Sequence, residues 1–330
     1  MKVWLNGRIL EQSQASISVL DRGFLFGDGI YEVVRYFARP GASPFGAGEP
    51  LHVARLARSL RLARIEGFDA AELPRIAAEL LAANGLADAS LYLQVTRGAG
   101  TNRAHVPTGP LVPTVFASVT PCEPIGQVRE PSAIRAITLE DLRWRLCSIK
   151  TVSLMGNILA LLEADGHGAQ EAILHRGGLV GEGAYSNVLC VRDGTLVTPP
   201  IEDDPPILHG VTRIDVLDAA RAAGVPFEVR PLPLAELRVA DEIMISASRR
   251  LVSGVTHLDG EPVGPGDVGP VTRRVFTAFR DAIAAHASPA GVSACDFPCR
   301  TRTSSPSASE TPRPVSASRS TAASWGPTAS

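Results

Sequence analysis

The sequence predicts a protein of the α/β class, more narrowly α+β, with two domains and a C-terminal tail. Its 330 residues are too many for one small domain, and 45% of them are hydrophobic, which is enough for a sizeable core. Strand-type and helix-type segments alternate along most of the chain, and the composition changes abruptly near residue 287.

The first domain is expected over residues 1–120. An Asn6-Gly7 turn between two apolar segments predicts a hairpin, and Gly85 is placed to end a helix. The Gly- and Pro-bearing stretch from Arg39 to Pro50 predicts a surface loop. The expected strands are Val3–Leu5, Arg8–Leu10, Ile30–Phe37, Ser90–Thr96 and Thr114–Val119, and the expected helices are His52–Ile65 and Glu72–Asn84.

A linker over residues 121–131 leads to a second domain over residues 132–286. Its expected strands are Ala133–Leu139, Glu171–His175, Asn187–Arg192, Phe227–Arg230, Glu242–Ser246 and Gly254–Leu258, and its expected helices are Leu154–Asp165, Thr212–Ala223 and Val271–His286. Residues 287–330 are rich in Ser, Thr, Pro, Ala and Arg, and we expect a disordered low-complexity tail because they cannot bury enough apolar surface.

Charge and composition narrow the function classes. The net charge of −2 indicates neither a nucleic-acid partner nor an anionic membrane, and no apolar run approaches the ~20 residues that span a bilayer. The five cysteines form no metal-like cluster, so no metal is expected. Without a signal sequence, free thiols indicate a cytoplasmic protein.

Lys150 is the first candidate for chemistry, since the chain has only two lysines, at positions 2 and 150. An ordinary lysine amine is protonated at neutral pH and is a poor nucleophile, but a desolvated amine or one joined to an aldehyde cofactor becomes useful. Taken alone, an exposed lysine at a helix start is the commoner explanation.

An anion site is the second candidate. Gly210-Val211-Thr212-Arg213 leads into a predicted helix, whose first N–H groups can bind a phosphate, although an ordinary threonine cap is an alternative. Arg55 offers a cation for the same anion, or is a solvated helix residue.

Two further patterns carry acidic and basic groups. Glu182, set between glycines in Gly181-Glu182-Gly183, can hold a protonated pyridine nitrogen, or is a turn glutamate. Arg103 and His105 follow a predicted strand and can clamp a carboxylate, or belong to a solvated basic loop.

At these residues the chain closely resembles the fold-type IV pyridoxal 5'-phosphate (PLP) enzymes, and within them the D-amino-acid aminotransferases. The resemblance covers about residues 2–285. Its motifs are Asp21-Arg22-Gly23 with the segment Phe26 to Val34, Gln94 to Gly98 with Arg103 and His105, Ile149-Lys150, Glu171 to Arg176, Glu182-Gly183 with Ser186-Asn187, and Leu208 with Gly210 to Arg213. The Arg103-x-His105 pair favours the D-amino-acid subfamily.

The resemblance implies a role for each matching residue. Lys150 would be the Schiff-base lysine and the catalytic proton carrier, and Glu182 would pair with the pyridine nitrogen. The other implied cofactor contacts are Arg55, Val211, Thr212 and Ser248 to the phosphate and Leu208 to the ring. Tyr31, Arg103 and His105 would hold the substrate carboxylate, and Arg103 and His105 would reach the neighbouring subunit's site in a homodimer.

The resemblance also implies a fold and a reaction. The small α/β domain would be joined to a larger domain with a barrel-like sheet. The expected reaction is ping-pong transamination of D-alanine and D-glutamate with pyruvate and 2-oxoglutarate. The alternatives are a branched-chain or (R)-amine transaminase, an aminodeoxychorismate lyase and a non-catalytic PLP-binding protein. Tyr185 departs from the small polar residue usual beside the ring.

Overall fold

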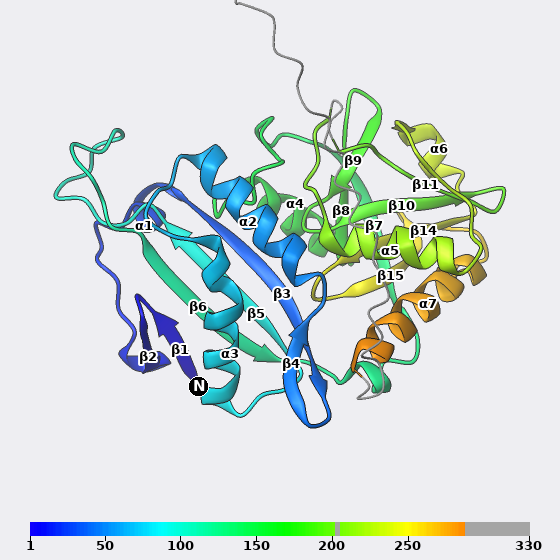
Figure 1. Cartoon of the computed structure of the whole chain (residues 1–330). Helices are drawn as coiled ribbons and strands as arrows, with labels where there is room; N and C mark the ends of the chain where they lie inside the picture. The colour runs from blue at the N-terminus through cyan, green and yellow to red at the C-terminus, as the bar shows by residue number, and fades with distance from the viewer. Residues whose placement is uncertain (202–204, 288–330) are drawn as a thin grey trace, which may run out of the picture. The chain divides into compact units, whose positions relative to one another are not determined.

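The computed structural model describes residues 1–201 and 205–287 (Figure 1). All helices and strands named below lie in one compact unit. The tail prediction for residues 287–330 lies outside the described residues, except at Ala287. No helix of the described residues is long and apolar enough to cross a membrane. The cytoplasmic location stays a prediction.

The N-terminal third forms a six-stranded antiparallel sheet with the order β2-β1-β6-β5-β3-β4. Its strands are β1 (Lys2–Leu5), β2 (Arg8–Glu11), β3 (Gly29–Arg39), β4 (Ala42–Gly46), β5 (Ala89–Thr96) and β6 (Thr114–Pro121). Helices α1 (Arg22–Phe26), α2 (Glu49–Ala63) and α3 (Leu73–Asn84) belong to the same part of the chain. Figure 1 shows α2 and α3 crossing one face of this sheet, where apolar residues such as Leu56 and Leu80 pack on Leu91 and Leu93 of β5.

The predicted hairpin is confirmed, because β1 and β2 pair antiparallel around Asn6 and Gly7, both of which have positive φ. The loop predicted from Arg39 to Pro50 is wrong. Residues Ala42–Gly46 form β4, which pairs with the end of β3, and α2 already begins at Glu49. Gly and Pro are compatible with strand here because β4 is an edge strand, where the outer N–H groups have no ladder partner.

A ten-stranded mixed sheet forms from residues 132–262, in the order β12-β11-β10-β14-β15-β7-β8-β9-β13, with β16 on β15. This sheet provides the barrel-like sheet expected from the resemblance. Its strands are β7 (Ser132–Glu140), β8 (Glu171–Arg176), β9 (Leu179–Gly183), β10 (Asn187–Arg192), β11 (Thr195–Thr198), β12 (Phe227–Val229), β13 (Leu232–Pro233), β14 (Glu242–Ala247), β15 (Leu251–Leu258) and β16 (Glu261–Pro262).

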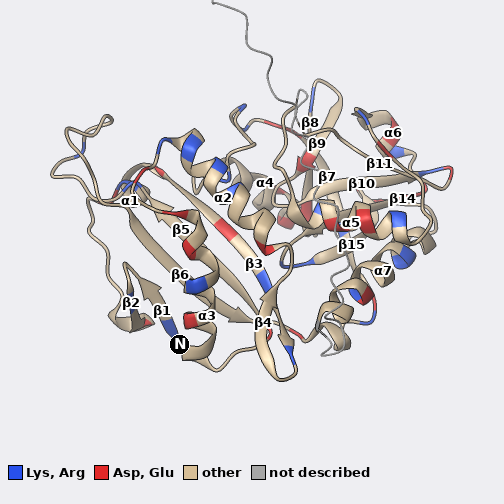
Figure 2. Ribbon diagram, in the orientation of Figure 1, with Lys and Arg blue, Asp and Glu red and all other residues tan. Residues whose placement is uncertain are grey.

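Helices α4 (Met155–Gly166), α5 (Val211–Ala222), α6 (Leu234–Arg238) and α7 (Pro270–Ala287) accompany this sheet. One core lies between the sheet and the helices α5 and α7, where Val216 and Phe276 meet Met244. Phe37 of β3 joins the same core, so a strand of the first sheet ends among residues of the second. Figure 2 shows charges of both signs along the described elements.

The predicted strands and helices of residues 132–286 are present with shifted ends, and several elements were missed: α1, β9, β11, β13, α6 and β16. The missed strand that matters most is β9, because it carries Glu182. From the sequence, a glutamate in a turn had been the alternative explanation of this residue. A Cβ at Gly183 would come within 2.3 Å of Ser186 Oγ, so this glycine permits close packing inside a strand. Between the two sheets, β6 ends at Pro121 and β7 begins at Ser132; the domain bounds themselves stay a prediction.

Candidate active site

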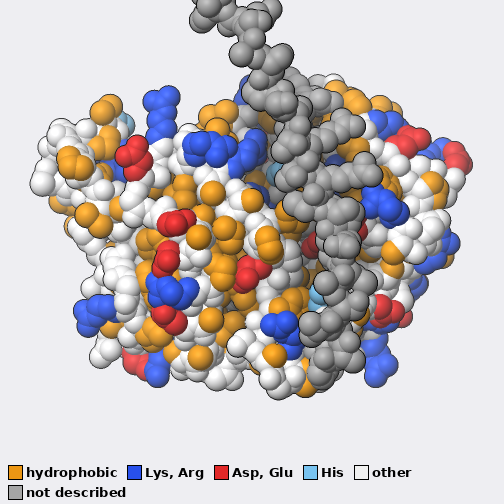
Figure 3. All heavy atoms as spheres, viewed as in Figure 1, with side chains coloured by type: hydrophobic (Ala, Val, Ile, Leu, Met, Phe, Trp, Pro, Cys, Tyr) orange, Lys and Arg blue, Asp and Glu red, His pale blue; other side chains and the backbone are white. Residues whose placement is uncertain are grey.

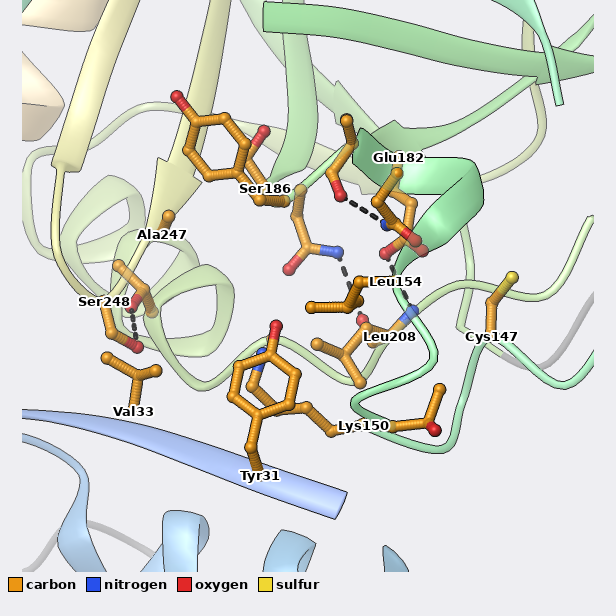
Figure 4. A pocket seen from close by; sticks show the side chains of 18 of the residues that line it. Tyr31, Val33, Cys147, Lys150, Leu154, Glu182, Ser186, Leu208, Ala247 and Ser248 are labelled. Carbon is orange, nitrogen blue, oxygen red and sulfur yellow. Dashed lines mark hydrogen bonds between the residues drawn. The ribbon is translucent and has the colours of Figure 1, made fainter. Parts of the chain in front are cut away.

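A cavity of about 260 Å³ lies where β3, the segment before α4, β9, the start of α5 and the loop after β14 meet (Figure 4). Eight of the ten residues predicted for the site line it. They are Tyr31, Arg55, Lys150, Glu182, Leu208, Val211, Thr212 and Ser248. Segments separated by more than 200 positions in the sequence therefore contribute to one cavity.

Backbone contacts to the start of β3 hold Lys150 in the cavity wall. Its carbonyl accepts the N–H of Tyr31 at 2.9 Å, and Ile30 and Thr151 form an isolated bridge. The amine lies over the Tyr31 ring, 4.2 Å from the ring centroid. Figure 4 shows both side chains entering the cavity from the same side. The structure thus favours a half-buried lysine in the cavity wall over the alternative of an exposed one.

Glu182 faces the cavity from β9 and is nearly fully buried. One carboxylate oxygen, Oε1, accepts from Arg143 Nη1 at 3.0 Å, and the other, Oε2, accepts from the Leu208 N–H at 2.9 Å. Burial raises the pKa of Glu182, while Arg143, the Leu208 N–H and Lys150 oppose that rise. The carboxylate is therefore fixed in direction, with a cation on one side and the cavity on the other.

The start of α5 presents free backbone N–H groups to the cavity. Gly210 precedes the helix, and no side chain of the described residues caps it. A Cβ at Gly210 would stand 1.7 Å from Asn187 Oδ1, so only glycine leaves this approach open. Thr212 Oγ1 donates to Ser248 Oγ at 3.4 Å, which brings two hydroxyls to the same helix start. These groups suit an anion with several oxygens.

Arg55 lines the cavity as part of a buried network. Its Nε donates to Glu32 Oε2 at 3.0 Å, and its Nη1 donates to the His209 carbonyl at 2.9 Å. Burial alone would raise the pKa of Glu32, but Arg55 and His52 hold that pKa well below its usual range. Glu32 therefore stays ionised and holds the Arg55 guanidinium in the wall.

Arg103 and His105 do not line the cavity of their own chain. They lie in the loop between β5 and β6, where the Arg103 guanidinium is 4.9 Å and the His105 ring 5.5 Å from the Phe26 ring centroid. Figure 1 shows this loop extending away from the sheets. The predicted reach of both residues into a neighbouring subunit stays a prediction.

Among the cavity residues to which the sequence analysis gave no role are Arg143, Asn187 and Ser246. Arg143 joins Glu182 to Asp141, to which its Nε donates at 2.9 Å. Ser246 Oγ is buried, lines the cavity and has no hydrogen-bond partner among the described residues. Neither residue had a local signal: β14 is buried on both faces and shows no alternation, and Arg143 is one of many arginines in the chain.

Comparison with known proteins defines the class. The Amino-transferase class IV family pattern matches residues 29–258. The chain therefore belongs to the class IV aminotransferases, as the fold and the cavity suggested.

Individual relatives narrow the comparison. The D-alanine aminotransferase of Staphylococcus haemolyticus is 36% identical over 289 residues, covering 87% of this chain and 99% of the relative. The branched-chain amino acid aminotransferase of Escherichia coli superposes with a TM-score of 0.77 at 26% identity, covering 84% of this chain and 93% of that one. A hypothetical aminotransferase from Mycobacterium tuberculosis in a PLP-bound form has a TM-score of 0.70 at 27% identity, covering 87% and 100%.

PLP is the cofactor of this class, and the residues present fit it. The cavity offers an amine, a fixed carboxylate and an uncapped helix start on different walls, which match the aldehyde, ring nitrogen and phosphate of PLP. The Ser246 hydroxyl without a partner and the side-chain-free approach at Gly210 mark places where polar groups of a ligand fit. The described residues contain no group of three or more His, Cys, Asp or Glu side chains that would hold a metal.

Proposed function

We propose that this aminotransferase transfers the amino group of D-amino acids, D-alanine and D-glutamate first, to 2-oxo acids such as pyruvate and 2-oxoglutarate. The observation that carries this proposal is the 36% identity to a D-alanine aminotransferase along 99% of that relative. The loop bearing Arg103 and His105 adds to it, because two basic side chains suit an α-carboxylate.

Each cavity residue has a proposed task. PLP, when bound, supplies an electron sink that stabilises the carbanion left at the substrate Cα. Lys150 would hold PLP covalently through Nζ, and this Nζ, once the substrate amine had displaced it, would be the free amine that removes the proton from Cα. Glu182, oriented by Arg143 and the Leu208 N–H, would keep a proton on the ring nitrogen.

The remaining residues would bind and orient. Val211, Thr212 and Ser248 would hold the phosphate at the start of α5, with Arg55 as a fixed cation in the adjacent wall. Leu208 would pack against the ring. Tyr31 would meet the substrate carboxylate together with Arg103 and His105 of the partner subunit.

This role for Arg103 and His105 requires a homodimer, which we propose on the strength of exposed apolar surface. On α4 the side chains of Met155, Ile158, Leu159 and Leu162 are 48–68% exposed, and Leu142 and Trp144 just before it are also exposed. Contiguous apolar residues of this size mark an interaction site. By contrast, Figure 3 shows charged side chains scattered among the apolar ones on the face that carries α2 and α3.

The half-reaction tests the substrate class directly. PLP-loaded protein is mixed with D-alanine without an acceptor, and the visible absorbance of the bound cofactor should shift to that of pyridoxamine 5'-phosphate while pyruvate appears. D-glutamate should act similarly. A shift with L-leucine and none with either D-amino acid would reject the D-specific proposal.

A branched-chain aminotransferase is the second candidate, favoured by the TM-score of 0.77 to the Escherichia coli enzyme. The same half-reaction with L-leucine separates the two, because the α-proton faces Lys150 in only one enantiomer when the carboxylate position is fixed.

A further inference from the structure

The segment from Asp21 to Asp28 has no part in the cavity, although it is among the most specific motifs of the sequence. It contains the short helix α1 and the arginine Arg22, whose side chain is only 9% exposed. A buried arginine must be paired and hydrogen-bonded, so its partners reveal its task.

The Arg22 guanidinium donates hydrogen bonds to the backbone of the loop between β5 and β6. Its Nη1 donates to the carbonyl of Ala104 at 2.6 Å, and its Nη2 donates to the carbonyl of His105 at 2.7 Å. Its Nε donates to Asp28 Oδ2 at 2.7 Å. A planar fork with donors in fixed directions matches these three acceptors, whereas all the donors of an ammonium group radiate from one atom.

Phe26 extends the same contact to the side chains of the loop. The guanidinium carbons of Arg22 and Arg103 each lie 4.9 Å from the centre of its ring, and the His105 ring lies 5.5 Å away. Attraction between a cation and a ring face favours this arrangement. The direction of both basic side chains is thus coupled to α1.

Asp21 and Asp28, at the two ends of this segment, bind to residues at the end of strand β5. Asp28 also accepts from Arg97 Nε at 2.8 Å, and Arg97 follows β5 directly. Asp21 caps α1 through the Gly23 N–H at 2.8 Å and accepts from Thr96 Oγ1, the last residue of β5, at 3.0 Å. Arg22 and Asp28 therefore connect the loop between β5 and β6, which is otherwise exposed, to the end of strand β5.

We propose that Arg22, Phe26 and Asp28 are positioning residues that hold Arg103 and His105 in place for the substrate α-carboxylate. The proposal rests on the proposed function, in which that pair binds the carboxylate in the partner subunit's site. None of the three positioning residues would touch substrate or PLP; they act through the loop.

The test compares two reagents that attack bound PLP. Aminooxyacetate carries a carboxylate and O-methylhydroxylamine does not, and each reaction is followed by loss of the cofactor's visible absorbance in the intact holoenzyme. Arg22→Lys should lower the rate constant for aminooxyacetate by about tenfold or more, as expected for lost hydrogen bonds to a charged group. The rate constant for O-methylhydroxylamine should stay unchanged.

Two further variants complete the experiment. Arg103→Ala should also slow aminooxyacetate selectively, and Arg75→Lys, which alters an exposed ion pair on α3, should slow neither reagent. If Arg22→Lys fails to bind PLP, Phe26→Leu decides, because it removes the ring contact and keeps an apolar side chain.

The outcomes separate the two proposals. No selective loss in Arg103→Ala would overturn the carboxylate role of the loop, and with it the proposed function of this pair. A selective loss in Arg103→Ala but not in Arg22→Lys or Phe26→Leu would overturn the positioning role alone. Equal loss with both reagents in Arg22→Lys would indicate a general structural defect and would also overturn it.

Discussion

At the scale of single residues, Lys150 takes its position from the backbone around it. The Lys150 carbonyl accepts from the Tyr31 N–H, and Thr151 Oγ1 donates to the Gly29 carbonyl at 3.1 Å. The side chain is thereby directed over the Tyr31 ring inside the cavity. A change of the side chain alone should leave this frame intact.

Lys150→Ala should therefore fold normally and lose transamination with every amino acid, because the amine that would hold PLP and move the α-proton is gone. Thermal unfolding checks the fold, and borohydride reduction followed by mass spectrometry checks the covalent link. Lys2→Ala, which removes the other lysine of the chain, should keep both activity and the link. Retained turnover in Lys150→Ala would refute the catalytic role.

Glu171 is another buried carboxylate, next to Glu182 and behind the Gly183–Ser186 turn. Its oxygens accept from the N–H groups of Ala172 and Ala184 and from Ser186 Oγ at 2.7–3.0 Å. Burial raises the pKa of Glu171 to about 7 in spite of these bonds. The folded state therefore keeps Glu171 protonated at pH values where the unfolded chain has released the proton.

The raised pKa sets the sign of a pH effect on stability. As pH rises from the unfolded value of 4.5 to about 7, the unfolded chain ionises first and is favoured, so this group lowers the free energy of unfolding over that interval. The shift corresponds to about 3 kcal/mol. Glu171→Gln should flatten this fall, measured by urea unfolding at pH 5 and pH 8. Glu79→Gln, at an exposed position, should leave it unchanged; an unaltered fall in Glu171→Gln would disprove the assignment.

At the scale of elements, the start of α5 decides the anion site. The helix begins after Gly210 without a side-chain cap, while Asn187 of β10 packs so closely on Gly210 that a Cβ has no room. The Asn187 amide also donates to the Leu208 carbonyl at 3.1 Å, which fixes the segment leading into the helix. The pairing of β10 with β14 thus places both the helix start and Ser246.

Gly210→Ala should weaken PLP binding by about tenfold or more, which corresponds to about 1.4 kcal/mol or more. The added methyl group must displace the Asn187 side chain or the helix start. Titration of the apoprotein with PLP, followed by absorbance, gives the dissociation constant. Gly126→Ala, where the added atom meets nothing within 4 Å, is the matched control. Equal affinities for both variants would contradict the proposed phosphate site.

At the scale of the whole molecule, two features of the structure favour a homodimer. Arg103 and His105 lie away from the cavity of their own chain, and the apolar side chains of α4 and the preceding segment are exposed. A homodimer that covers α4 would account for both features, because it buries the apolar surface and offers the loop a second site.

Leu159→Arg should convert the proposed homodimer to monomers and reduce activity with α-carboxylate substrates more than PLP binding. Leu159 is 58% exposed on α4, and a buried unpaired charge at an interface is strongly unfavourable. Light scattering after size-exclusion chromatography gives the mass. Leu62→Arg on α2, where the side chain is 43% exposed, should leave the mass at that of the wild type. A monomeric wild-type protein would refute the arrangement.

The accuracy of the fold prediction followed the strength of local signals. Amphipathic helices such as α3 and alternating strands such as β5 were predicted nearly to their ends, because their periodicity reflects one buried face. The missed strands are short, rich in Gly or Pro, or both, and they are held by neighbours far away in sequence. For example, β13 pairs with β9 some 50 residues earlier, and no local sequence pattern predicts that pairing.

The sequence alone predicted the class of chemistry through its resemblance to the fold-type IV PLP enzymes, whose motifs include Lys150, Glu182 and the Gly210 to Arg213 segment. These are local features whose residue types carry their own chemistry. Only the tertiary structure decided that Arg143 holds Glu182, that Glu32 holds Arg55 and that Arg22 holds the loop of Arg103. Such contacts depend on packing between distant segments, in which many arginines of the sequence are equivalent candidates until the fold selects among them.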